Sequence, residues 1–299
     1  MFQKILVPLD GSDLSAAALA IAVSYLKDRE LDGELYLVMV AEPLPEAYGA
    51  YPIDPDFDEA VKQGYRRYLD GIAAEIAVSG IRVNAEVVSG SIIDRLVDAV
   101  IAHGVELIMM TSHGLGGVSR FWLGSTAARL IRSSPVPLLL LRAGADGAVP
   151  PLAPKKVLLP LDGTGFGEEI IAHAISLAGL TSAEFHLVEV VKEIPKVLSG
   201  ASLDHDLRVL REREAHAESY LRELKTQVRG QGGRCHTHVL RAASVAQRLI
   251  EFSQLTGVDL IALSSHGRGG MGRLLMGSVA DKLIRGTELP LLLNGPVNN

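Results

Sequence analysis

Cysteine, aromatic residues and long hydrophobic runs are all scarce in this sequence. Cys235 is the single cysteine among 299 residues, so no internal disulfide forms and a disulfide-stapled scaffold is excluded. Aromatic residues make up 5% of the chain, so aliphatic side chains and alanine must build the core. No apolar stretch approaches the roughly 18 to 20 residues that span a bilayer. The first residues carry no signal-peptide pattern, and we expect a cytoplasmic protein.

The charge balance is mildly acidic. Lys and Arg number 29 against 35 Asp and Glu, which gives a net charge of −6. This balance argues against a general nucleic-acid binder. A content of 48% hydrophobic and 21% charged residues is ordinary for globular domains and excludes a disordered chain. We therefore expect neither a nucleic acid nor a membrane as partner.

One sequence pattern occurs twice. The sequence of residues 5–19 (ILVPLDGSDLSAAAL) recurs in similar form at residues 157–171 (VLLPLDGTGFGEEII). Asp10 matches Asp162 at an offset of 152, and His113 matches His266 at 153. A nearly constant offset over such a distance indicates domain duplication rather than a short-repeat solenoid. We predict one domain at 1–143, a Gly-, Ala- and Pro-rich linker at 144–155 and a second domain at 156–299.

Strands and helices are expected to alternate in each copy. The first copy predicts strands at 4–9, 34–41, 81–88, 106–111 and 136–141, and helices at 12–27, 58–78, 92–103 and 126–132. The second copy predicts strands near 156–161, 184–191, 234–240, 259–264 and 289–293. A charged helix at 204–228 is expected to face the sheet with its apolar residues, namely Leu207, Leu210, Ala217, Leu221, Leu224 and Val228.

This alternation predicts an α/β fold of two doubly wound, mostly parallel five-stranded sheets flanked by helices. The first, fourth and fifth strands are continuous apolar runs, as expected where helices cover both faces of a sheet. In such sheets the ligand crevice lies beyond the carboxyl ends of the strands, where the strand order reverses. Both of the motifs that recur in the two copies follow such strand ends.

The first motif is Pro-Leu-Asp-Gly followed by Ser or Thr. Its acid and hydroxyl residues are favoured helix caps and its glycine permits a tight turn, so capping alone is one interpretation. The other is a carboxylate at the sheet edge that accepts a hydrogen bond from a base or ribose, or helps to hold a metal ion. The candidate residues are Pro8, Asp10, Gly11 and Ser12, and in the second copy Pro160, Asp162, Gly163 and Thr164.

The second motif is Ser-His-Gly, nine residues, then Gly-Ser. A glycine-rich loop and a helix start present backbone N–H groups to an anion, which is phosphate-binding chemistry. The alternative is a loop that merely caps a helix. Neither a P-loop nor a GxGxxG pattern is present. The candidates are His113, Gly114, Gly124 and Ser125, and in the second copy His266, Gly267, Arg268, Gly277 and Ser278.

On these motifs the chain resembles a tandem universal stress protein, with two such domains over nearly its whole length. Nucleotide-binding members carry Gly-x-x-Gly, nine residues, then Gly-Ser or Gly-Thr, together with an acid ending strand one and a valine in strand two. The acid matches Asp10 and Asp162, and the valine matches Val40 and Val190. The family's first glycine is replaced by Thr111 and Ser264, which the resemblance still places at the site, and it also places phosphate beside Thr126 and Val279.

The resemblance implies an adenine nucleotide alpha hydrolase-like fold and a stress-response regulator that binds ATP or AMP in one or both copies. Adenine would contact the valine, and Mg²⁺ or Mn²⁺ would bridge the phosphates of ATP. The second copy has Arg268, a candidate phosphate contact, where the first copy has Leu115. We therefore expect the second copy to be the better nucleotide site. We assign no catalytic residue, and we take His113 and His266 to position the loop. The alternatives are a member that binds no nucleotide and acts through protein contacts, which Thr111 and Ser264 favour, and a slow ATPase.

Two further expectations concern partners and metals. In the resembled family the fifth strands pair across a dimer, so a tandem chain would form an intramolecular pseudo-dimer, and a further homodimer and a protein partner stay open. Cys235, His236 and His238 share one strand and would suit zinc, but a fourth ligand is missing. We favour an edge strand with polar residues that face water.

Overall fold

The computed structural model describes residues 1–27, 32–42, 55–113, 123–144, 147–193, 203–265 and 276–295. The chain forms two compact units, whose main parts are Phe2–Leu152 and Ala153–Pro296. We call them the first and the second repeat. Within the described ranges, no helix has the length and apolar character that crossing a membrane requires.

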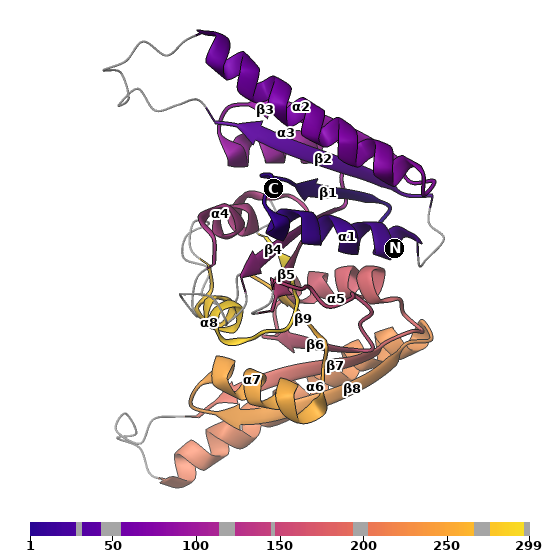
Figure 1. Ribbon diagram of the computed structural model, residues 1–299. Coiled ribbons are helices and arrows are strands. Elements are labelled where there is room, and N and C mark those ends of the chain that lie inside the picture. Colours follow the sequence, from indigo (N-terminus) through magenta and orange to yellow (C-terminus); the bar gives the residue numbers. More distant parts are fainter. Residues whose placement is uncertain are drawn as a thin grey trace, which may run out of the picture. The chain divides into compact units, whose positions relative to one another are not determined.

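Strand and helix alternate throughout the first repeat. The elements are β1 (Lys4–Pro8), α1 (Asp13–Lys27), β2 (Glu34–Ala41), α2 (Pro55–Ala77), β3 (Arg82–Ser89), α3 (Ile92–His103), β4 (Leu107–His113), α4 (Ser125–Ser133) and β5 (Leu138–Ala143). The strands lie in the order β3-β2-β1-β4-β5 and pair in parallel. Right-handed crossovers place α1 and α2 on one face of the sheet and α3 and α4 on the other (Figure 1).

The second repeat has the same topology. Its elements are β6 (Lys156–Leu161), α5 (Gly165–Ala178), β7 (Glu184–Lys192), α6 (Leu203–Gly230), β8 (Arg234–Ala242), α7 (Val245–Thr256), β9 (Leu260–Ser264), α8 (Ser278–Gly286) and β10 (Leu291–Asn294). The order is β10-β9-β6-β7-β8, again parallel. The order therefore reverses between β1 and β4 in one repeat and between β6 and β9 in the other.

The predicted doubly wound, parallel α/β architecture is confirmed in each repeat. The apolar runs of β1, β4, β5 and β6 are buried, as strands covered on both faces should be. The prediction for the charged helix is wrong at Leu207, which is 39% exposed near the amino-terminal end of α6. Farther along the same helix, Ala217, Leu221, Leu224 and Val228 are buried as predicted.

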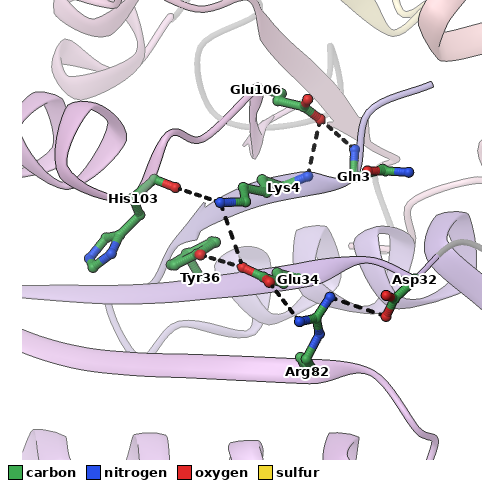
Figure 2. A network of polar contacts seen from close by, with 8 residues as sticks. All are labelled: Gln3, Lys4, Asp32, Glu34, Tyr36, Arg82, His103 and Glu106. Carbon is green, nitrogen blue, oxygen red and sulfur yellow. Dashed lines mark hydrogen bonds and ion pairs between the residues drawn. The ribbon is translucent and has the colours of Figure 1, made fainter.

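The amino-terminal ends of the strands are joined by a polar network (Figure 2). In the first repeat, Glu106 Oε2 accepts the backbone N–H groups of Gln3 at 2.6 Å and Lys4 at 3.2 Å, which ties β1 to the residue before β4. Arg82 Nη1 lies 3.0 Å from Glu34 Oε1, which joins β3 to β2. The remaining members of the network are Asp32, Tyr36 and His103.

The second repeat rebuilds this network with different side chains. Asp259 Oδ1 accepts the N–H groups of Lys155 and Lys156, both at 3.1 Å. Arg234 and Glu184 repeat the pair between the third and second strands at 3.7 Å. The amino edge of each sheet is therefore fastened by its own side chains, and the motifs found in the sequence lie at the opposite edge.

Candidate functional site

A pocket of about 200 Å³ opens at the carboxyl edge of the first repeat. It lies where the strand order reverses, because the ends of β1 and β4 both line it. The lining includes six of the predicted residues: Pro8, Asp10 and Ser12 from the first motif, and Val40, Thr111 and Thr126 from the family resemblance. It also includes residues that motif reasoning missed, among them Leu14, Ser15, Met39, Tyr65, Ile92 and Leu96.

Asp10 organises the turn between β1 and α1. Its Oδ1 accepts the backbone N–H of Ser12 at 3.0 Å and the hydroxyl at 2.6 Å. Gly11 between them has φ +81°, a conformation that favours glycine. Partial burial would raise the pKa of Asp10, but hydrogen bonds from Ser12 and Ser15 outweigh burial and lower it. The carboxylate thus stays ionised at the rim of the pocket.

Asp162 builds the same turn in the second repeat. Its Oδ1 accepts the N–H of Thr164 at 3.2 Å and the hydroxyl at 2.6 Å, and Gly163 has φ +76°. Thr164 then caps α5 by accepting the N–H of Gly167 at 3.1 Å. The capping interpretation of the first motif therefore describes the turn in both repeats. In the first repeat the same turn also lines a pocket.

The hydroxyl residues that replace the family's first glycine have a structural partner. The Thr111 hydroxyl donates to the carbonyl of Leu14 in α1 at 2.5 Å. The Ser264 hydroxyl donates to the carbonyl of Phe166 in α5 at 3.0 Å. Leu14 and Phe166 lie at matching places, four residues after Asp10 and Asp162. In both repeats the hydroxyl therefore ties the end of the fourth strand to the first helix.

The Gly-Ser pairs of the second motif begin α4 and α8. Gly124 and Gly277 are the N-cap residues, with φ, ψ of −53°, 146° and −60°, 142°. These angles do not require glycine, and among the described residues a Cβ on Gly124 would meet no atom within 4 Å. Ser125 and Thr126, and Ser278 and Val279, form the first helical positions. A helix start of this kind presents N–H groups to an anion.

Strand register places the two predicted valines at equivalent positions. Pro8 pairs with Val38, and Pro160 pairs with Val188, so Val40 and Val190 each follow by two residues. Val40 lines the pocket of the first repeat. Between the paired residue and the valine stands Met39 in one repeat and Glu189 in the other, which comparison of the two copies in the sequence would have revealed.

A buried arginine lies beside the second motif in the first repeat. Arg142 on β5 pairs in register with Ser112, and its Nη1 donates to the Ser112 hydroxyl at 2.6 Å. Its side chain is 6% exposed, and burial lowers its pKa to about 10. At neutral pH the guanidinium is still charged, so it adds positive potential beside the carboxyl end of β4.

Part of the second motif lies outside the described residues. This applies to Gly114, His266, Gly267 and Arg268, and His113 is the last residue of β4. The sequence-based preference for the second copy depended on Arg268, so the described residues do not test it.

The zinc interpretation finds no support among the described residues, where no group of three or more His, Cys, Asp and Glu could hold a metal ion. Cys235 is fully buried on β8, and burial raises its pKa to about 11. His238 instead lies 3.2 Å from His186 of β7, between ring nitrogens, and its ring packs on Phe252 of α7 at 4.8 Å. These histidines belong to an aromatic cluster beneath α7.

Fold and site together define a duplicated, doubly wound α/β protein whose crevice lies at the carboxyl ends of its strands. Within this class the chain belongs to the universal stress protein family, whose family model matches residues 1–142 and again 154–293. The predicted resemblance to a tandem universal stress protein is thereby confirmed.

Relatives of single and double length support this assignment. A universal stress protein of Mycolicibacterium smegmatis is 26% identical over 303 residues, covering 98% of this chain and 97% of the relative. One from Thermus aquaticus is 33% identical over 144 residues, covering 48% of this chain and 100% of the relative. The solved universal stress protein of Archaeoglobus fulgidus has a TM-score of 0.66 at 19% identity, covering 97% and 95% of the two chains, and shows the shared fold.

Proposed function

We propose that this protein is a cytoplasmic stress-response regulator that binds an adenine nucleotide, ATP or AMP, at the carboxyl edge of its strands. The observation that carries the proposal is the pocket of the first repeat. It lies at the strand-order reversal and is lined by residues of the first recurring motif and by Thr111 and Thr126, which flank the second. Pockets at this place in doubly wound sheets are where nucleotides bind.

Each part of the nucleotide has a matching part of the pocket. Val40, Met39, Ile92 and Leu96 supply an apolar wall for adenine. The ionised carboxylate of Asp10 accepts hydrogen bonds from ribose hydroxyls. The start of α4, at Gly124, Ser125 and Thr126, offers N–H groups to phosphate. The corresponding residues of the second repeat are Asp162, Val190, Gly277, Ser278 and Val279.

A metal ion would enter this site with the ligand. Mg²⁺ or Mn²⁺ bound to ATP is coordinated largely by phosphate oxygens and water. This fits a chain whose described residues contain no cluster of metal ligands. Regulation then consists of binding itself, since the occupied and empty states present different surfaces at the strand ends to a partner protein.

The test is calorimetric titration of nucleotide-stripped protein with ATP and with AMP, in the presence and absence of Mg²⁺. We expect saturable binding that Val40→Asp abolishes, because a carboxylate replaces part of the apolar wall. Val78→Asp is the matched control, since Val78 is 90% exposed after α2, and it should bind like the unaltered protein. Absence of heat at millimolar ATP and AMP would overturn the proposal and favour a protein-contact module.

A further inference from the structure

We propose that the first repeat holds the nucleotide and that the second repeat rejects it through carboxylates at the corresponding edge of its sheet. The inference rests on the proposed function and assigns it to one of the two repeats. Four observations carry it, each a difference between equivalent positions of the two repeats.

The first difference lies in the second strand of each repeat. Met39 and Glu189 are equivalent, because each follows by one residue the partner of the motif proline. Met39 is 2% exposed and lines the pocket, whereas Glu189 is 7% exposed. A buried apolar wall in the first repeat is thus replaced by a buried carboxylate in the second. A polyphosphate or a π-electron-rich base is poorly placed beside such a charge.

The second difference is the number of acids around that carboxylate. The second repeat has Glu168 and Glu189 where the first repeat has Ala16 and Met39. Burial raises the pKa of Tyr220 of α6, and the charges of Glu168, Asp162 and Glu189 raise it further, so all three acids act on this region of the second repeat. The pocket of the first repeat is lined by one acid, Asp10.

The third difference is at the helix that would hold phosphate. The first turn of α4 contains no acid, and Ala128 stands four residues after its N-cap Gly124. The same position of α8 is Asp281, in the first turn. Arg285 Nε donates to Asp281 Oδ1 at 2.9 Å and offsets part of its charge. An acid there competes with an anionic ligand for the positive end of the helix.

The fourth difference adds positive charge to the first repeat. Arg142 is buried beside Ser112, one residue beyond Thr111 of the pocket. Ser264, the counterpart of Thr111, pairs with Asn294, so the residue matching Arg142 is Gly295. Among the residues that the structure describes, the carboxyl edge of the first repeat therefore carries the cation Arg142, and that of the second carries the additional acids. Phosphate is favoured in the first repeat and opposed in the second.

The experiment measures stoichiometry and assigns the site. Titration of the full chain with Mg-ATP should give one site, and Met39→Glu should weaken it at least about tenfold, as expected for a charge buried in the apolar wall. Met39→Gln, of similar size without charge, should weaken binding less than Met39→Glu, and Val78→Glu at an exposed position is the matched control that should leave the dissociation constant unchanged. Thermal melting verifies that these variants remain folded.

A gain of binding tests the second repeat directly. Glu189→Met combined with Asp281→Ala should raise the stoichiometry from one to two, and Glu189→Gln replaces Glu189→Met if that variant fails to fold. Two sites in the unaltered protein, one site that survives Met39→Glu, or no second site in the combined variant would each overturn the inference while leaving nucleotide binding intact. Absence of any binding would overturn the proposed function, and the inference with it.

Discussion

Thr111 and Ser264 stand at the position where nucleotide-binding members of the family carry the first glycine of the motif. At the motif's first glycine, a side chain is expected to obstruct the ligand. The hydroxyls instead donate to the carbonyls of Leu14 and Phe166, so each side chain links the fourth strand to the first helix of its repeat. Thr111 lines the pocket at the same time. Its replacement of glycine is therefore compatible with a pocket at this edge.

The first prediction concerns this hydroxyl. Thr111→Val keeps the side-chain shape and removes the donor to Leu14, so the free energy of unfolding should fall by about 1 kcal/mol, the usual net value of one hydrogen bond. Urea unfolding of the full chain measures it. Thr237→Val, on the edge strand β8, is the control and should change stability by less than about 0.5 kcal/mol. Equal losses in both variants would contradict the assigned role.

At the level of elements, the two ends of the strands differ in each repeat. The carboxyl ends precede the starts of α4 and α8 and in the first repeat line the pocket. The amino ends of the first repeat carry the polar network of Lys4, Glu34, Arg82 and Glu106 (Figure 2). The second repeat keeps the connection between its first and fourth strands through Asp259. Stability and ligand affinity are expected to respond to different residues.

Glu106→Ala tests this separation in the first repeat. It removes the acceptor of two backbone N–H groups, and because they lie near water the stability should fall by about 1 kcal/mol. Nucleotide affinity should stay unchanged within about twofold, since Glu106 lies at the end of the strands away from the proposed site. Glu212→Ala, an exposed acid of α6, is the control for loss of charge. A change in affinity without a loss of stability would refute the division between the two ends of the strands.

Elements were easier to predict than their neighbours in space. Sequence alone located β1, β6 and α3. A strand buried on both faces is a continuous apolar run, and a helix buried on one face has apolar residues at a helical spacing. The last residues of β4, Ser112 and His113, are polar and were not predicted as strand. Tyr65, Ile92 and Leu96 reach the pocket from α2 and α3, and no local pattern marks such tertiary contacts.

On the scale of the whole molecule, the two repeats share a topology but differ in chemistry. Strand register matches His186 of the second repeat with Tyr36 of the first, and His238 with Glu86. Tyr36 stacks on His103 at 4.8 Å, and burial with the neighbouring Glu34 raises its pKa to about 12. The first repeat therefore keeps this tyrosine neutral, where the second repeat has a histidine whose pKa burial lowers below its ordinary value of 6.5. The pairing of the fifth strands predicted from the resemblance stays a prediction.

The histidine cluster makes the second repeat sensitive to acid. Burial lowers the pKa of His186 most. The charges of His236 and Lys156 lower it further, and Glu184 raises it in part. Burial also lowers the pKa of His238, and the charges of His186, His236 and Lys225 lower it further. A histidine whose pKa is lower when folded binds protons more readily when unfolded. Stability is therefore complete above the ordinary value of 6.5 and is lost as the pH falls from there toward the folded pKa.

Hydrogen exchange resolved by peptide separates this effect from global unfolding. Between about pH 7.5 and about pH 5.5, after correction for intrinsic exchange, protection should fall in β7, β8 and α7 and change much less in β2, β3 and α3. His238→Gln, which cannot be protonated in this range, should reduce the difference. The pH dependence belongs to the second repeat if this pattern holds. Two outcomes would show that the buried histidines do not control the pH dependence. One is an equal loss of protection in both repeats, and the other is greater protection of the second repeat at the lower pH.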